Sequence, residues 1–355
     1  IQTIPKYTKR TATIVTSAFC GNHFPRQPNK RPSMPIDKKT MPILSFPGIQ
    51  LMGVSVDAMV RDGELQAKCM EAIAKRYDMA ASLSLMDLSV EAEAFGSPVK
   101  YSENEVPTVT AAIIAEPEDA EKLLVPPVGA GRTGEYLRAV ELAAKAVQDR
   151  PVFAGAIGPF SLAGRLLDMT EIMVQCYDDP EMVKLVLDKA TEFIIAYMKA
   201  FKEKGANGVV MAEPAAGLLS PSLIAEFSNP YVKKIREAVE DENFLFIYHN
   251  CGNTIPLMKE IVSIGMRVLH LGNSIKLEDA LGIVPRDMLV MGNISPANEF
   301  RQGTPASMQK AVDAMFAACG SYPNFVISSG CDIPPASPME NIDAYFKAVA
   351  AHDKI

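Results

Sequence analysis

Short apolar runs alternate with amphipathic segments along most of this chain. The apolar runs have the length and composition of buried strands, and segments with helical spacing separate them. Strands that alternate with helices predict a parallel sheet, and eight such units predict a (β/α)8 barrel of the TIM type. The predicted strands span residues 42–46, 79–86, 152–157, 207–213, 244–249, 267–271, 288–292 and 325–329.

Helix signals support this alternation. The clearest helix begins at Asp179, a capping residue that Pro180 follows at the first helical position. Its apolar residues keep helical spacing until Gly205, which is a usual C-terminal signal. Ser220-Pro221 begins another helix in the same way, and Pro230 is expected to kink or break it. The stretch 87–150 is too long for a simple connection and predicts a helical, lid-like insertion over the barrel mouth.

Three Gly-Asn pairs follow predicted strands at intervals of 20 residues: Gly252-Asn253, Gly272-Asn273 and Gly292-Asn293. Glycine and asparagine tolerate positive φ, which a sharp strand-to-helix turn needs. One such pair indicates only a turn. Three in phase favour repeated βα units, whose turns lie on the face where barrel enzymes carry their chemistry.

The composition is that of a globular protein, with 355 residues of which 48% are hydrophobic, and no apolar run is long enough for a membrane span. Six dispersed cysteines favour a reduced, cytoplasmic setting. The net charge of −7 is uneven, because residues 1–40 carry eight Lys or Arg and one acid, Asp37. We interpret this basic extension as an arm lying on an acidic body, residues 41–355, that forms a single barrel domain. An anion-binding role for the arm is the alternative, and no nucleic-acid motif is present.

Potential metal ligands follow two distant strands. His249 and Cys251 come at the end of one predicted strand, and Cys331 follows Gly330 at the end of another. One imidazole and two thiolates suit Zn²⁺, and three dispersed protein ligands are typical of a catalytic ion with an open fourth position. A lone histidine is more often structural, so the prediction depends on the two cysteines.

Other polar residues end strands on the same face. Glu213 is a candidate fourth ligand, general base or partner that orients His249, with a turn cap as the alternative. Asp87 is a candidate catalytic carboxylate, although a helix cap explains it almost as well. Asn273 and Asn293 are candidate cofactor-binding residues. Cys20 and His23 have a weak ligand spacing, and His270 is expected to pack or to lie behind the ligands.

Four sequence stretches resemble a known family. They are Gly158–Ala163, the helix start at Asp179-Pro180-Glu181, Ala212–Pro221, and Gly292–Pro296. Together they resemble the uroporphyrinogen decarboxylase superfamily of (β/α)8 barrels, from about residue 41 onward. Within it the closer likeness is to corrinoid-dependent methyltransferases, such as methylcobamide:coenzyme M methyltransferases, whose zinc signature is His-x-Cys and a later Cys.

The resemblance implies a zinc enzyme that moves a methyl group between a methyl-corrinoid and a thiol such as coenzyme M. The corrinoid would be presented by a separate corrinoid protein, and a homo-oligomer is possible. The first alternative is a metal-free decarboxylase of a porphyrinogen-like tetrapyrrole, with Asp87 as the central carboxylate. The second is a non-enzymatic accessory protein that binds a corrinoid or a metal. Neither a nucleic acid nor a membrane is an expected partner.

Overall fold

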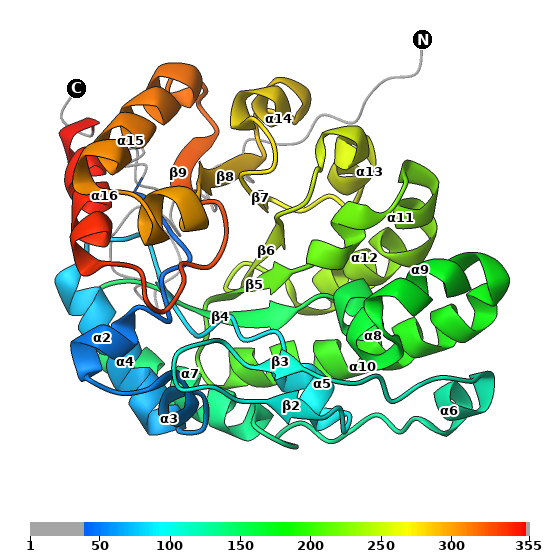
Figure 1. Cartoon of the computed structure of the whole chain (residues 1–355). Helices are drawn as coiled ribbons and strands as arrows, with labels where there is room; N and C mark the ends of the chain where they lie inside the picture. Colours follow the sequence, from blue (N-terminus) through cyan, green and yellow to red (C-terminus); the bar gives the residue numbers. More distant parts are fainter. Residues whose placement is uncertain (1–38, 353–355) are drawn as a thin grey trace, which may run out of the picture.

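The computed structural model describes residues 39–352 and shows a curled parallel sheet surrounded by helices (Figure 1). Seven strands hydrogen-bond in the order β1-β4-β5-β6-β7-β8-β9, and every neighbouring pair is parallel. The predicted TIM-barrel-like fold is confirmed. The strands are β1 (Ser82–Leu83), β4 (Val152–Ile157), β5 (Gly208–Ala212), β6 (Leu245–Asn250), β7 (Val268–Leu271), β8 (Leu289–Ile294) and β9 (Phe325–Ser329).

Helices follow the strands and cover the outside of the sheet (Figure 1). The long α10 confirms the predicted helix start, since the Asp179 side chain accepts a hydrogen bond from the Met182 N–H. Gly205, with φ +97°, follows its end. The predicted break at Pro230 falls where α11 gives way to α12. The helices after β4 are α8 (Pro159–Leu167), α9 (Met169–Asp178), α10 (Pro180–Glu203), α11 (Pro221–Phe227), α12 (Asn229–Val239), α13 (Met258–Ser263), α14 (Leu277–Ile283), α15 (Pro305–Cys319) and α16 (Met339–His352), with short turns η1 (Pro214–Leu218), η2 (Ile255–Leu257) and η3 (Pro296–Arg301).

The prediction of a strand at residues 42–46 is wrong. This segment is buried between β1 and β9, but it makes no regular ladder. Two serine side chains of β9 bond here: the Ile43 N–H donates to Ser329 Oγ (2.9 Å), and Ser328 Oγ donates to the carbonyl of Met41, the residue just before the segment (2.7 Å). The Ile43 carbonyl accepts from the Ile333 N–H (3.0 Å), beyond the end of β9. Pro42 lacks an N–H, so a continuous ladder cannot form there. The segment therefore fills the gap that an eighth strand would occupy.

The chain before β4 holds α2 (Gly48–Met52), α3 (Val56–Val60), α4 (Gly63–Arg76) and the long stretch that follows β1. That stretch contains α5 (Val90–Ala94), a hairpin of β2 (Val99–Lys100) with β3 (Thr108–Val109), α6 (Pro117–Lys122) and α7 (Thr133–Ala146). It is tied to the end of α8, because the Ile113 and Ile114 N–H groups both donate to the Leu166 carbonyl. Within residues 39–352, no helix combines the length and apolar character that crossing a bilayer requires.

Candidate metal centre

The turn after β6 is built to hold His249 and Cys251 in place. His249 pairs in register with Ala212 of β5 and His270 of β7. The Asn250 side chain braces the turn: its Nδ2 donates to the Glu213 carbonyl (2.8 Å), and its Oδ1 accepts from the Gly252 N–H (2.8 Å). These bonds turn the chain directly after the strand and leave Cys251 at its carboxyl end.

Glycines are required here by close backbone approach. A Cβ on Gly272 would lie 2.4 Å from the Cys251 Cα, and one on Gly330 would lie 2.9 Å from the Asn273 backbone nitrogen. Of the three predicted Gly-Asn turns, only Gly292 has a positive φ, at +149°. The glycines thus bring the β6, β7 and β9 turns together, mainly through their missing side chains rather than through unusual dihedral angles.

The structure brings together the three predicted metal ligands. The ligand atoms of His249, Cys251 and Cys331 all lie within 4.8 Å of one another, and Cys331 Sγ is 3.4 Å from His249 Nε2. In a tetrahedral zinc site with Zn–S bonds of about 2.3 Å, sulfur ligands are about 3.8 Å apart. The group therefore needs only a small contraction to bind Zn²⁺, and its donor set of one nitrogen and two sulfurs fits that ion.

The two thiols perturb each other. The pKa of Cys251 falls to about 4, because the Cys331 thiol hydrogen-bonds to its sulfur and His249 lies beside it, while burial opposes the shift. The pKa of Cys331 is raised correspondingly. One thiolate is thus favoured before any metal binds, and the thiolate is the form that ligates metal.

His270 packs directly behind His249. The ring centroids are 4.7 Å apart in an edge-on arrangement, and both side chains are buried. Burial, together with the neighbouring His249, lowers the pKa of His270 well below its usual value. The expectation that His270 packs is confirmed, and it packs against the predicted ligand His249, whereas Cys20 and His23 lie outside the described residues.

Glu213 does not join the metal group. Its buried carboxylate accepts hydrogen bonds from the Phe160 N–H (3.0 Å), the Ser161 N–H (2.6 Å) and the Ser161 hydroxyl. These donors belong to the first turn of α8, where a negative charge is favourable. Burial raises the pKa of Glu213 to about 7. The side chain therefore anchors α8 beside the end of β5.

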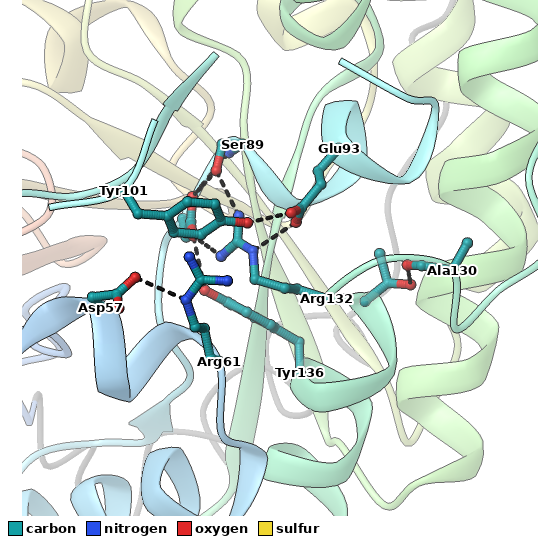
Figure 2. Close-up of polar contacts among 10 residues, drawn as sticks. Asp57, Arg61, Ser89, Glu93, Tyr101, Ala130, Arg132 and Tyr136 are labelled. Atoms are coloured by element: carbon teal, nitrogen blue, oxygen red, sulfur yellow. Dashed lines mark hydrogen bonds and ion pairs between the residues drawn. The ribbon is translucent and has the colours of Figure 1, made fainter. Parts of the chain in front are cut away.

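Asp87 lies in a buried ion-pair cluster around Arg132. Figure 2 shows Arg132 of this cluster with Ser89, Glu93 and Tyr136. One of its oxygens accepts from Arg132 Nη1 (2.5 Å) and the Tyr136 hydroxyl (3.0 Å). The other accepts from the Ser89 N–H (3.0 Å) and hydroxyl (2.6 Å). Arg132 also pairs with Glu93. A carboxylate has about four acceptor positions, and here all four are used.

The two asparagines have different surroundings. Asn293 is buried, and its Nδ2 donates to the Gly272 and Ile275 carbonyls (both 3.0 Å), which brings the β7 turn against β8. Asn273 is exposed beside Gly330.

One further residue did not stand out from the sequence. Arg165 of α8 is partly buried, and its pKa is lowered. Burial is the main cause, and the negative charges of Asp87 and Glu91 oppose the shift only in part. No hydrogen bond or ion pair joins its guanidinium to the described part of the chain. Its sequence signal is weak, because an arginine inside a helix usually indicates a solvated face.

Comparison with known proteins identifies a family and a similar fold. Residues 30–352 match the sequence profile of the uroporphyrinogen decarboxylase (URO-D) family. The methylcobamide:CoM methyltransferase MtbA of Methanosarcina mazei is 28% identical over 285 residues, which cover 79% of this chain and 82% of the relative. A uroporphyrinogen decarboxylase of Hydrogenovibrio crunogenus is 25% identical over 308 residues, covering 82% and 84%. The solved structure of a methyltransferase from Methanosarcina mazei superposes with a TM-score of 0.80 at 24% identity, covering 96% of this chain and 98% of that one.

Proposed function

The chain belongs to the uroporphyrinogen decarboxylase family, and we propose that within it the protein is a zinc-dependent methyltransferase acting between a methyl-corrinoid and a thiol. The convergence of His249, Cys251 and Cys331 carries this proposal. The similarity to methylcobamide:CoM methyltransferases supports the methyl-transfer chemistry and the corrinoid donor.

The proposed ligands leave room for a substrate. His249 Nε2 and the two cysteine sulfurs supply three ligands, and no fourth His, Cys or carboxylate joins them within residues 39–352. When bound there, zinc would favour the deprotonated form of a substrate thiol and orient it toward a methyl group. Two thiolates neutralise the charge of the ion, so a third sulfur would keep its nucleophilic character.

The chain's other residues would shape access and binding. We place the corrinoid, carried by a separate corrinoid protein, at the carboxyl ends of the strands, where Asn273 and Asn293 lie. Glu213 would hold the start of α8 in position beside the end of β5. Arg165, whose guanidinium has no hydrogen bond or ion pair among the described residues, is the candidate cation for an acidic group on the thiol substrate, such as the sulfonate of coenzyme M.

The decarboxylase alternative has less support from the side chains. A tetrapyrrole would need free acceptors on Asp87, and both of its oxygens already bind Arg132, Tyr136 and Ser89. The accessory-protein alternative predicts binding without turnover. An activity assay therefore distinguishes all three possibilities once the metal content is known.

The decisive experiment is zinc analysis of the purified protein beside Cys331→Ala and Cys251→Ala. About one zinc per chain in the wild type, lost in both variants, is the expected result. Cys176→Ala is the matched control, because Cys176 is a buried free thiol in α9, outside the ligand group. Zinc-loaded wild type should then transfer methyl from methylcobalamin to a thiol. Absence of zinc after reconstitution under reducing conditions would refute the proposal.

A further inference from the structure

A line of hydrogen bonds leads from the proposed metal ligand His249 through two further buried side chains, those of His270 and Ser328. His249 Nδ1 lies 2.9 Å from His270 Nδ1, and His270 Nε2 lies 2.8 Å from Ser328 Oγ. Ser328 Oγ lies 2.7 Å from the Met41 carbonyl oxygen. The three side chains come from β6, β7 and β9, and Met41 directly precedes the segment that fills the gap beside β1.

The direction of these hydrogen bonds follows from the last acceptor. A carbonyl can only accept, so the single hydroxyl proton of Ser328 is directed to Met41. Ser328 Oγ must then accept from His270, which places a proton on His270 Nε2. With its single ring proton on Nε2, His270 has one donor nitrogen and one acceptor nitrogen. Its Nδ1 is therefore an acceptor.

The same logic fixes the proton on His249. The two groups near its Nδ1 are His270 Nδ1 at 2.9 Å and the His270 carbonyl oxygen at 3.2 Å, and both are acceptors. His249 therefore carries its proton on Nδ1. Its Nε2 then has a free lone pair, and this is the nitrogen that faces Cys331 Sγ.

We propose that His270 and Ser328 are positioning residues that hold His249 in the tautomer whose Nε2 binds the metal. This inference rests on the proposed function only in naming that metal as zinc. Histidine ligands commonly donate to a carboxylate or a backbone carbonyl, and loss of such a partner weakens metal binding by roughly 10–100-fold. Here the principal acceptor is a neutral imidazole, which adds no further negative charge beside two thiolates.

The chain of hydrogen bonds also couples the metal site to closure of the sheet. Met41 lies directly before the segment that takes the place of the eighth strand; Ser328 of β9 bonds to Met41, and Ser329 bonds to Ile43 of the segment. Only Ser328 also contacts His270. Ser329→Ala therefore removes a hydrogen bond to the same segment while leaving the path to His249 intact, which makes it a matched control.

The test measures zinc affinity by competition with a chelator and the His249 tautomer by nitrogen-15 NMR of the imidazoles. His270→Phe keeps a ring but removes both nitrogens, and roughly 10–100-fold weaker zinc binding is expected. Ser328→Ala should weaken zinc binding less. His270 remains in this variant and loses only the hydroxyl acceptor that keeps its proton on Nε2. His270→Asn, which keeps an acceptor oxygen near the position of Nδ1, should restore most of the affinity. Ser329→Ala should bind zinc like the wild type.

The metal-free wild type gives the second measurement, which needs no variant to fold. His249 should carry its proton on Nδ1 before zinc is added. A proton on Nε2, or unchanged affinity in a folded His270→Phe variant, would overturn the proposal while leaving the zinc ligands intact. A wild type that binds no zinc would instead remove the proposed function, and the tautomer would still test the hydrogen-bond chain.

Discussion

Substitution of Asp87 tests whether this carboxylate has a structural or a chemical role. Its side chain is fully buried, with 0% exposure, and that of Arg132 is 7% exposed. Removing one partner from a buried ion pair leaves an uncompensated charge and costs about 3–5 kcal/mol. Arg132→Met should approach that range, because Asp87 would retain only neutral donors. Asp87→Asn should cost less, about 2 kcal/mol, because Arg132 still pairs with Glu93.

Urea unfolding of the two single variants and of the double variant measures these free energies. The double variant should be less destabilised than the sum of the single variants, by at least about 1 kcal/mol, because both remove the same pair. Folded Asp87→Asn should keep its zinc and most of its methyl-transfer rate. If it kept zinc and stability but lost turnover, the structural explanation would be refuted and Asp87 would belong to the chemistry.

Two further predictions concern the groups around this cluster. Arg165→Gln should raise the KM for a thiol that carries an acidic group by roughly 10-fold or more, because a charge-assisted hydrogen bond is lost, and should leave the KM for a neutral thiol unchanged. Equal effects on both thiols in a steady-state assay would contradict the binding role. Burial raises the pKa of Glu91 from 4.5 to about 7, so the folded state holds this proton more tightly and loses stability as pH rises from about 4.5 to 7. This loss totals about 3 kcal/mol, about 2 kcal/mol of which falls between pH 5.5 and 8.5. Glu91→Gln cannot ionise and should gain that difference relative to the wild type in urea unfolding, whereas a pH-independent difference would show that Glu91 is not buried as a neutral acid.

The local signals in the sequence predicted much of the fold. Apolar runs located all seven strands of the large sheet, and the Asp-Pro cap located α10. Both signals are local, because apolar patterning and helix capping involve residues that are close in the sequence. The prediction of the eighth strand failed for one local and one distant reason. Residues 42–46 are largely apolar and buried as a strand would be, but Pro42 lacks an N–H, and the Ile43 N–H donates to the hydroxyl of the distant Ser329 rather than to a strand carbonyl.

The sequence by itself determined which chemistry is possible here. A His-x-Cys at one strand end and a cysteine at another offer candidate nitrogen and sulfur ligands, and parallel strands bring their carboxyl ends to one edge. Only the tertiary structure decided how the other strand-end groups are used. Glu213 and Asp87 look alike as carboxylates after apolar strands, yet one caps α8 and the other pairs with Arg132.

The physical reason is that a polar side chain acts according to its hydrogen-bond partners, and those partners come from distant parts of the chain. Ser328 and Met41 are 287 positions apart, yet their contact fixes the direction of the bonds that reach His249. Residue type and spacing set the available donors and acceptors, while packing of the curled sheet decides which of them meet.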